Sequence, residues 1–405
     1  MDLLEPFVRE VKALGSGQRG RYLGIISLGY GLLIGSRMIY PVLLPYLRTA
    51  FDLSLTAAGL LVSVLGIVGA IGQLPAGLFA DRYSERSVMA LSLVLVGSAY
   101  GVIVLAPSTL VLFGATALVG VGISQYPIAR ITFISALYRD RIGSAIGVTM
   151  AAGDLGQTLV PPLAGVIAAA IAWQVGFGFV IPLFAIVALL VVVILPSGSS
   201  EQQTDESLSL DTVRTLVVEL RNPGMILTTI VLFLYIFVWQ AFTGFYPTYL
   251  VEVKGLSSSV AGLLFGLFFA LGVPVKPLAG SAFDRLGLNR SLLLVLGGPL
   301  VGFLMLPSIQ GFWPLVATIA VLSTVLGSGA ITQGFLADSL ARDVRGTGLG
   351  VIRGTSALFG ATGPFVFGGL ADRGYFDEGY LMLGGLLAAA IVLVTLSSKF
   401  RKPAL

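Results

Sequence analysis

Charged side chains stand inside stretches of this sequence that are otherwise apolar over roughly 20 residues. They are Arg37, Arg130, Asp154, Lys276 and Arg353. A charge at the centre of a bilayer costs at least about 2.5–3.5 kcal/mol, so a charge kept there indicates a function. Four cations against one carboxylate would be relieved by an anion, and the planar fork of arginine suits the oxygens of a carboxylate or a phosphate. These residue types therefore predict a site for a small organic or inorganic anion.

The four cations are expected at similar depths. Lys276, Arg130 and Arg353 each stand eight or nine residues from the charged residue that ends their stretch on one side, roughly 12–14 Å along a helix. Arg37 stands eleven residues from Arg48 on the other side, roughly 16 Å by the same rise. All four cations therefore converge near the middle of a bilayer.

Aromatic and polar residues of the same stretches are candidates for the lining of this site. They are Tyr30, Tyr40, Gln125, Tyr126, Trp239, Gln240, Tyr246 and Gln333. The substrate-binding set that we predict is Arg37, Arg130, Lys276, Arg353, Gln240, Gln333, Tyr40 and Trp239. Asp154 is the one acid among them and is the candidate for proton coupling, because burial or a neighbouring arginine can move its pKa. The alternative is internal pairing, in which Asp154 satisfies Arg130 or Arg37.

The elements that must position these residues are membrane-spanning helices. The chain is 56% hydrophobic and only 11% charged, whereas a soluble domain is typically about 25% charged. We predict an all-α membrane protein with twelve transmembrane helices. Their ranges are 22–46, 56–80, 87–106, 109–137, 142–169, 173–195, 224–250, 257–282, 291–308, 312–337, 346–371 and 380–398.

The chain repeats itself. The group Gly77, Asp81 and Arg82 recurs as Gly280, Asp284 and Arg285 at an offset of 203 residues (280 − 77), and the trailing Arg86 recurs as Arg290, one residue further on. The repeat predicts a cytoplasmic segment 1–21, a six-helix bundle 22–195, a cytoplasmic linker 196–222, a second six-helix bundle 223–398 and a cytoplasmic tail 399–405. At this offset Arg37, Arg130, Lys276 and Arg353 correspond to Gln240, Gln333, Gln73 and Met150. No cation has a cationic twin, so the repeat alone does not explain the charges.

Absent residue types and the distribution of charge narrow the function. The chain has no His and no Cys, so we expect no metal site, no cofactor and no enzyme active site. The net charge of +4 needs no nucleic-acid partner, because most Lys and Arg residues fall in loops on one side of the predicted spans; the other side holds Arg48, Lys254 and Arg373. This asymmetry predicts a multi-pass protein of the cell membrane with both termini in the cytoplasm.

The glycine and Asp-Arg group after the second and the eighth span resembles the loop signature of the major facilitator superfamily. The resemblance implies two pseudo-symmetric six-helix bundles that alternate in access around a site at the midplane. It also implies a monomer and a cytoplasmic latch, formed here by Gly77, Asp81, Arg82, Arg86, Gly280, Asp284, Arg285 and Arg290. The run that begins at Arg37 resembles the first span of organophosphate/phosphate antiporters, which implies anion binding by Arg37. Cations in spans eight and eleven, Lys276 and Arg353, resemble those of the oxalate/formate exchanger.

The function predicted from these observations is secondary active transport of a small anion, an organic carboxylate or a phosphate ester, by proton symport or by anion exchange. One alternative is a proton-coupled exporter of amphipathic or cationic compounds, whose cavity would favour acids and aromatic residues over four cations. A remote alternative is a membrane sensor that transports nothing, which would need a soluble output domain.

Overall fold

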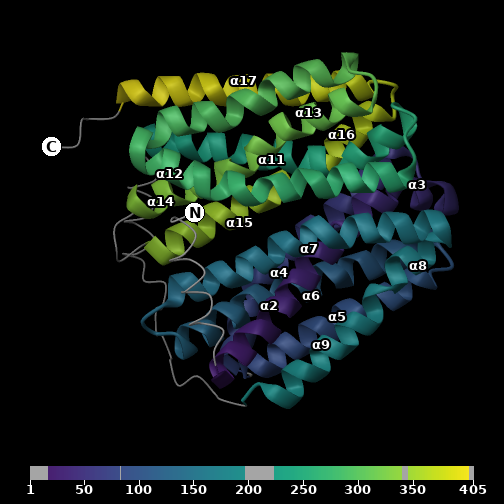
Figure 1. Ribbon diagram of the computed structural model, residues 1–405, viewed down its shortest axis with the longest axis vertical. Helices are drawn as coiled ribbons and strands as arrows, with labels where there is room; N and C mark the ends of the chain where they lie inside the picture. The colour runs from purple at the N-terminus through teal and green to yellow at the C-terminus, as the bar shows by residue number, and fades with distance from the viewer. Residues whose placement is uncertain (1–16, 83, 197–222, 340–344, 401–405) are drawn as a thin grey trace. The chain divides into compact units, whose positions relative to one another are not determined.

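The computed structural model describes residues 17–82, 84–196, 223–339 and 345–400. For residues 74–82, 333, 337–339, 345–347 and 397–400 it describes the helix alone. Every regular element in these ranges is a helix (Figure 1). Most of the predicted linker and of the predicted terminal segments lies outside the described residues.

The described residues of the first half of the chain form eight helices. They are α2 (Gly17–Arg37), α3 (Ile39–Phe51), α4 (Leu55–Arg82), α5 (Glu85–Val104), α6 (Thr109–Leu137), α7 (Ile142–Ala170), α8 (Trp173–Gly178) and α9 (Val180–Ile194). Serine side chains begin two of them: Ser84 accepts the Ser87 amide at 3.3 Å and Ser108 accepts the Val111 amide at 3.4 Å. Such caps satisfy amides that have no partner in the first turn of a helix.

The second half is also helical. Its elements are α11 (Pro223–Glu252), α12 (Ser258–Met305), η1 (Leu306–Ser308), α13 (Phe312–Leu322), η2 (Ser323–Gly327), α14 (Ser328–Ser339), α15 (Arg345–Gly360), α16 (Gly363–Ala371) and α17 (Phe376–Phe400). Within α12, Gly287 has a φ of 74° and a ψ of 175°, a conformation that glycine adopts without a Cβ penalty. The chain therefore bends there, between the predicted spans 257–282 and 291–308.

Nine helical stretches of the described residues are long and apolar enough to cross a membrane. One of them, 258–308, contains the eighth and ninth predicted spans. The fifth predicted span falls on α7, and the eleventh falls on α15 and α16, which are outside the nine. Each of the twelve predicted ranges thus falls on one or more helices of the structure, apart from a residue or two at some ends and at the breaks within the first, sixth and eleventh ranges.

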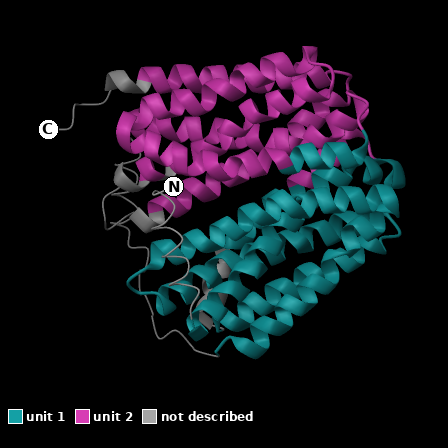
Figure 2. Cartoon of the chain, in the orientation of Figure 1, with its two compact units in different colours: residues 1–52, 64–203, 257–266 teal, residues 53–63, 204–256, 267–405 magenta. Residues whose placement is uncertain are grey.

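The chain forms two compact units (Figure 2). Unit 1 comprises residues 1–52, 64–203 and 257–266, and unit 2 comprises residues 53–63, 204–256 and 267–405. The first turns of α4 thus belong to unit 2, and the first turns of α12 belong to unit 1. The bundle boundaries predicted from the sequence stay a prediction.

The interior of unit 1 combines stacked aromatic rings with close backbone packing. Tyr100 stacks on Phe177 and on Phe184, with ring centroids 5.9 and 6.0 Å apart. Helices α2 and α7 approach closely at glycines, because a Cβ on Gly156 would overlap the backbone of Gly31. Small residues that let backbones meet are the usual contact between helices in membranes, where apolar burial gives little drive for association.

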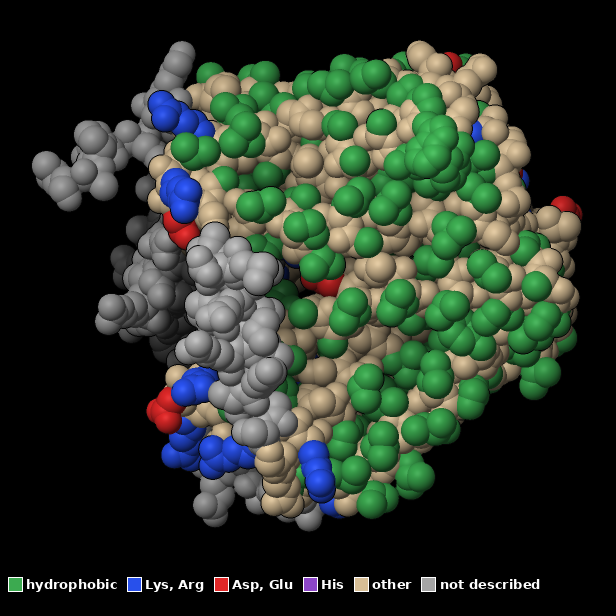
Figure 3. Space-filling model, in the orientation of Figure 1, with side chains coloured by type: hydrophobic (Ala, Val, Ile, Leu, Met, Phe, Trp, Pro, Cys, Tyr) green, Lys and Arg blue, Asp and Glu red, His purple; other side chains and the backbone are tan. Residues whose placement is uncertain are grey.

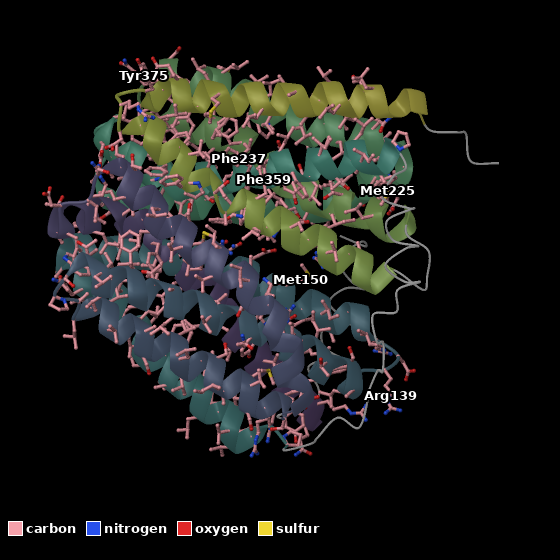
Figure 4. All side chains as sticks on the ribbon, turned by 180° about the vertical axis from the view of Figure 1, so that it is seen from behind. Arg139, Met150, Met225, Phe237, Phe359 and Tyr375 are labelled. Atoms are coloured by element: carbon pink, nitrogen blue, oxygen red, sulfur yellow. The ribbon has the colours of Figure 1, made fainter. Side chains whose placement is uncertain are left out.

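The interior of unit 2 is built mainly from the rings of α11 and α17. Tyr249 of α11 lies edge-on to Tyr380 of α17, with ring centroids 4.6 Å apart. Phe237 of α11 and Phe359 of α15 lie together (Figure 4), with centroids 5.5 Å apart. These contacts join α15 and α17 to α11.

Large hydrophobic side chains cover much of the face drawn in Figure 3, and Lys and Arg side chains gather at one end of it. Among the exposed large hydrophobic side chains of the described residues, Leu110 and Leu278 have exposed fractions of 83% and 68%. Apolar patches of this extent are rare on soluble monomers. They suit the hydrocarbon core of a bilayer, with the basic residues at its border.

Candidate functional site

The first predicted span is interrupted at Arg37. Helix α2 ends at this residue, and α3 begins at Ile39 after one turn residue, whose amide bonds to the Gly35 carbonyl at 3.0 Å. Pro41 explains the break, because proline has no amide to donate to the carbonyl four residues earlier and its ring clashes with that carbonyl. Tyr100 donates its hydroxyl to the neighbouring Ser36 carbonyl at 2.9 Å. A break at mid-membrane is tolerated where neighbouring groups satisfy the backbone in this way.

Arg130 of α6 is the most completely buried of the described cations, with an exposed fraction of 4%. Its Nη1 donates to the Thr149 hydroxyl on α7 at 2.6 Å. Thr149 donates its own proton to the Ile146 carbonyl at 2.8 Å, so its oxygen is left to accept from the guanidinium. The Arg130 Cζ lies 3.8 Å from the centroid of the Tyr30 ring on α2. Three helices therefore fix the orientation of this cation.

Glycine makes room for this arrangement. A Cβ on Gly153 of α7 would lie 2.8 Å from the Tyr30 ring, so any larger residue would displace the ring. The ring of Tyr30 attracts the guanidinium through its quadrupole, an attraction that reaches about 2 kcal/mol or more in a desolvated setting.

One edge of the Arg130 guanidinium is left for another partner. Its Nε is buried and donates to no acceptor in the described part of the chain. Because buried donors are nearly always satisfied, the Nε edge needs an acceptor, and a two-oxygen anion fits that edge bidentately. The internal pairing of Asp154 with Arg130 or Arg37, which the sequence left open, stays a prediction.

Other candidates of unit 1 are engaged in its interior. The hydroxyl of Tyr40 donates to Thr116 at 3.1 Å, and that of Tyr126 donates to the Ile26 carbonyl at 3.0 Å. Arg37 is partly buried beside Tyr100, and Asp154 is partly buried on α7. A substrate role for these residues stays a prediction.

The candidates of unit 2 lie on α11, α12 and α15. Gln240 donates its amide to the Ala357 carbonyl at 3.3 Å, and the Trp239 Nε1 is buried with no acceptor among the described residues. Lys276 is partly buried and Arg353 is exposed. The side chain of Gln333 lies outside the described residues.

The predicted latch is described only in part. At Gly77, Asp81 and Arg82 the structure describes the helix alone and no side chain. Arg86 donates to the Leu195 carbonyl at 3.2 Å, which ties the beginning of α5 to the end of α9. A Cβ on Gly280 would meet nothing within 4 Å, and Asp284, Arg285 and Arg290 are exposed on α12. The latch role of this group stays a prediction.

Sequence reasoning missed Thr149. Hydroxyl residues are frequent in membrane helices, where they bond to the carbonyl one turn earlier. Nothing in the spacing of Thr149 distinguishes it from those, and its role appears only when α6 and α7 are placed side by side.

Comparisons with known proteins match this chain to membrane transporters. The model of the Major Facilitator Superfamily matches residues 26–364. A hexuronate transporter of Bacillus subtilis is 25% identical over 86% of this chain and 87% of its own length. A phosphoglycerate transporter protein of Salmonella typhimurium is 26% identical over 92% of this chain and 88% of its own. The crystal structure of a nucleoside transporter, at 15% identity, covers 95% of this chain and 100% of its own with a TM-score of 0.80, which shows the fold.

We expect Thr149→Val to lower the apparent Tm of the purified protein, because it leaves a charged donor without its acceptor, a loss of about 1–3 kcal/mol. Thr149→Ser keeps the hydroxyl and should keep the Tm. In an Arg130→Met background, Thr149→Val should have almost no effect, since the two changes remove one interaction. An equal loss of Tm in both backgrounds would show that Thr149 acts independently of Arg130.

Proposed function

Because this chain belongs to the Major Facilitator Superfamily, we propose that it is a secondary transporter that moves a small anion across a membrane by alternating access. The observation that supports this function most directly is the buried Arg130, whose Nε edge has no acceptor among the described residues. An anion at that edge neutralises a charge that the surrounding helices leave uncompensated.

The geometry around Arg130 also explains how an anion would be selected. Thr149 and Tyr30 hold the guanidinium before any substrate arrives, so little conformational entropy is lost on binding. Two coplanar oxygens are required to use Nε together with a neighbouring nitrogen, and carboxylates and phosphates both offer them. A neutral solute offers no compensating charge and would leave the guanidinium desolvated.

The relatives support the same class of substrate. Two of them are named for hexuronate and for phosphoglycerate, and both compounds carry a carboxylate. We therefore propose an organic carboxylate or a phosphate ester as the substrate. Arg37, Lys276 and Arg353 are the further cations that we assign to binding, with Gln240, Gln333, Tyr40 and Trp239 as polar and aromatic neighbours.

The setting of this function follows the distribution of charge in the sequence. We propose that the chain resides in the cell membrane with both termini in the cytoplasm, that it acts as a monomer and that it needs no cofactor. Proton symport and anion exchange differ in the role of Asp154, which is the one acid within the predicted spans.

Thermal stabilisation by a panel of anions tests the substrate class. The panel is oxalate, lactate, galacturonate, sulfate, nitrate, phosphate, glycerol phosphate and 3-phosphoglycerate. An anion that binds only the folded protein, at 100 times its Kd, stabilises it by about 2.7 kcal/mol. We expect at least one carboxylate or phosphate ester to raise the Tm.

Arg130→Gln should lose this response, and the matched control Arg373→Gln should keep it, because Arg373 is exposed in the turn after α16 and its side chain donates to the nearby Gly369 carbonyl. If no anion raises the Tm and lipophilic cations do, the substrate class is wrong and the exporter function is favoured.

A pH gradient across proteoliposomes tests the role of Asp154. With the most stabilising anion of the panel as substrate, Asp154→Asn should abolish uptake driven by the pH gradient, because the amide binds no proton in this range. Exchange of the same anion across the membrane should continue. Gradient-driven uptake at the wild-type rate would remove Asp154 from proton coupling.

A further inference from the structure

The first turns of α4 and the helix α16, both in unit 2, cap each other. The carboxylate of Asp372, at the end of α16, accepts the Leu55 amide at 3.0 Å and the Thr56 hydroxyl at 2.8 Å. In return, the hydroxyl of Ser63 accepts the Phe365 amide at 3.0 Å. Each helix thus supplies a side chain to the unsatisfied amides at the beginning of the other.

The carboxylate is held in its charged form. Partial burial acts to raise the pKa of Asp372, but the hydrogen bonds from Thr56 and from the Leu55 amide outweigh it, so the pKa lies below its usual value. Ionised Asp372 also suits the positive end of the α4 dipole. At the other end of the pairing, Ser63 is buried, with an exposed fraction of 1%.

Between the two caps the backbones are in direct contact. A Cβ on Gly59 of α4 would lie 2.9 Å from the Pro364 carbonyl carbon, and one on Gly368 of α16 would lie 3.1 Å from the Leu55 carbonyl carbon. Interdigitated side chains therefore contribute little at this contact. The polar caps at its ends are what fix the register of the two helices.

The internal repeat supplies a comparison within the same chain. At the offset of 203, Gly59 and Gly368 correspond to Gly262 and Gly165 (59 + 203 and 368 − 203). That second pair also forms a helix contact, between α7 and the first turns of α12 in unit 1, where a Cβ on Gly165 would lie 3.8 Å from the Gly262 Cα.

Both capping residues are missing from the second contact. Asp372 corresponds to Ala169 (372 − 203), and Ser63 corresponds to Gly266 (63 + 203). The glycines therefore belong to the repeat, whereas the caps occur in one copy only. A feature added to one of two equivalent contacts is evidence of a role that the fold itself does not require.

We propose that Asp372 and Ser63 form a polar latch that holds the first turns of α4 on α16 in one state of the transport cycle and is released in the other. This proposal rests on alternating access, which is part of the proposed function. Release is feasible because Asp372 is exposed and Thr56 is only partly buried, so water replaces their hydrogen bonds once the pairing opens. By the predicted topology the latch lies on the side of the membrane opposite the termini. The corresponding glycine contact of α7 with α12 has no carboxylate cap, so its separation would break no hydrogen bond of this kind.

A thiol reporter tests the latch without any substrate. The natural chain has no cysteine, so Val62→Cys introduces the single thiol. Val62 packs at the latch, because it and Pro364 both lie close to Gly244, and it takes part in neither cap. The measurement is the rate at which a maleimide labels this thiol in the purified protein.

We expect Asp372→Ala to raise the labelling rate about tenfold, which corresponds to about 1.4 kcal/mol in the opening equilibrium. Ser63→Ala should raise it as well, and Asp372→Glu, which keeps a carboxylate, should raise it less. The matched control is Asp377→Asn. This nearby acid accepts the Tyr249 hydroxyl at 2.6 Å and is not part of the latch, so its change should leave the rate near that of Val62→Cys alone.

Equal rates with and without Asp372→Ala and Ser63→Ala would overturn the latch. An equal rise with Asp377→Asn would also overturn it, because it would reflect general loosening of unit 2. No anion is present in this assay, so a wrong substrate class leaves its result unaffected. Conversely, an intact anion response in Asp372→Ala together with unchanged labelling would refute the latch alone.

Discussion

A guanidinium buried among membrane helices is the constraint on which the proposed anion site depends. Arg130 is 4% exposed. The free-energy cost of removing its charge from water is offset only when the protein or a ligand supplies acceptors. The helices supply a hydroxyl and an aromatic face, which orient the cation without neutralising it. The tight packing of α2 on α7 at Gly156 and the space left by Gly153 serve this orientation, because they bring Tyr30 and Thr149 to the same cation.

The fold is duplicated, whereas the residues of the proposed site are not. The repeat supplies the helices and their glycine contacts in two copies, whereas the groups able to bind or switch occur once. At the offset of the repeat, Arg130 corresponds to Gln333 and Asp372 corresponds to Ala169. A symmetric scaffold allows two equivalent motions, and polar groups added to one copy give the two states of the cycle different free energies. The residues that we propose to bind the anion and to form the latch are thus those that depart from the repeat.

The fold was largely predictable and the contacts were not. The apolar runs placed all twelve predicted spans on helices, and Pro41 accounts for the break at Arg37 by local chemistry. The short η2 segment inside the tenth span and the partnership of Arg130 with Thr149 depend on packing between helices, which hydropathy does not encode. The hydrogen bond from the Leu55 amide to Asp372 joins residues 317 positions apart, so no local sequence pattern predicts it. The charged loop group around Asp81 can be recognised in the sequence because it repeats, whereas Asp372 and Ser63 do not repeat.

A structure of the purified protein with the most stabilising anion of the panel tests whether Arg130 binds the substrate. We expect density for the anion with two oxygens within hydrogen-bond distance of the Arg130 guanidinium, one of them at Nε, while Tyr30 and Thr149 keep their positions. An anion bound elsewhere, with the Nε edge of Arg130 facing only protein atoms, would contradict the account and make this arginine a structural residue.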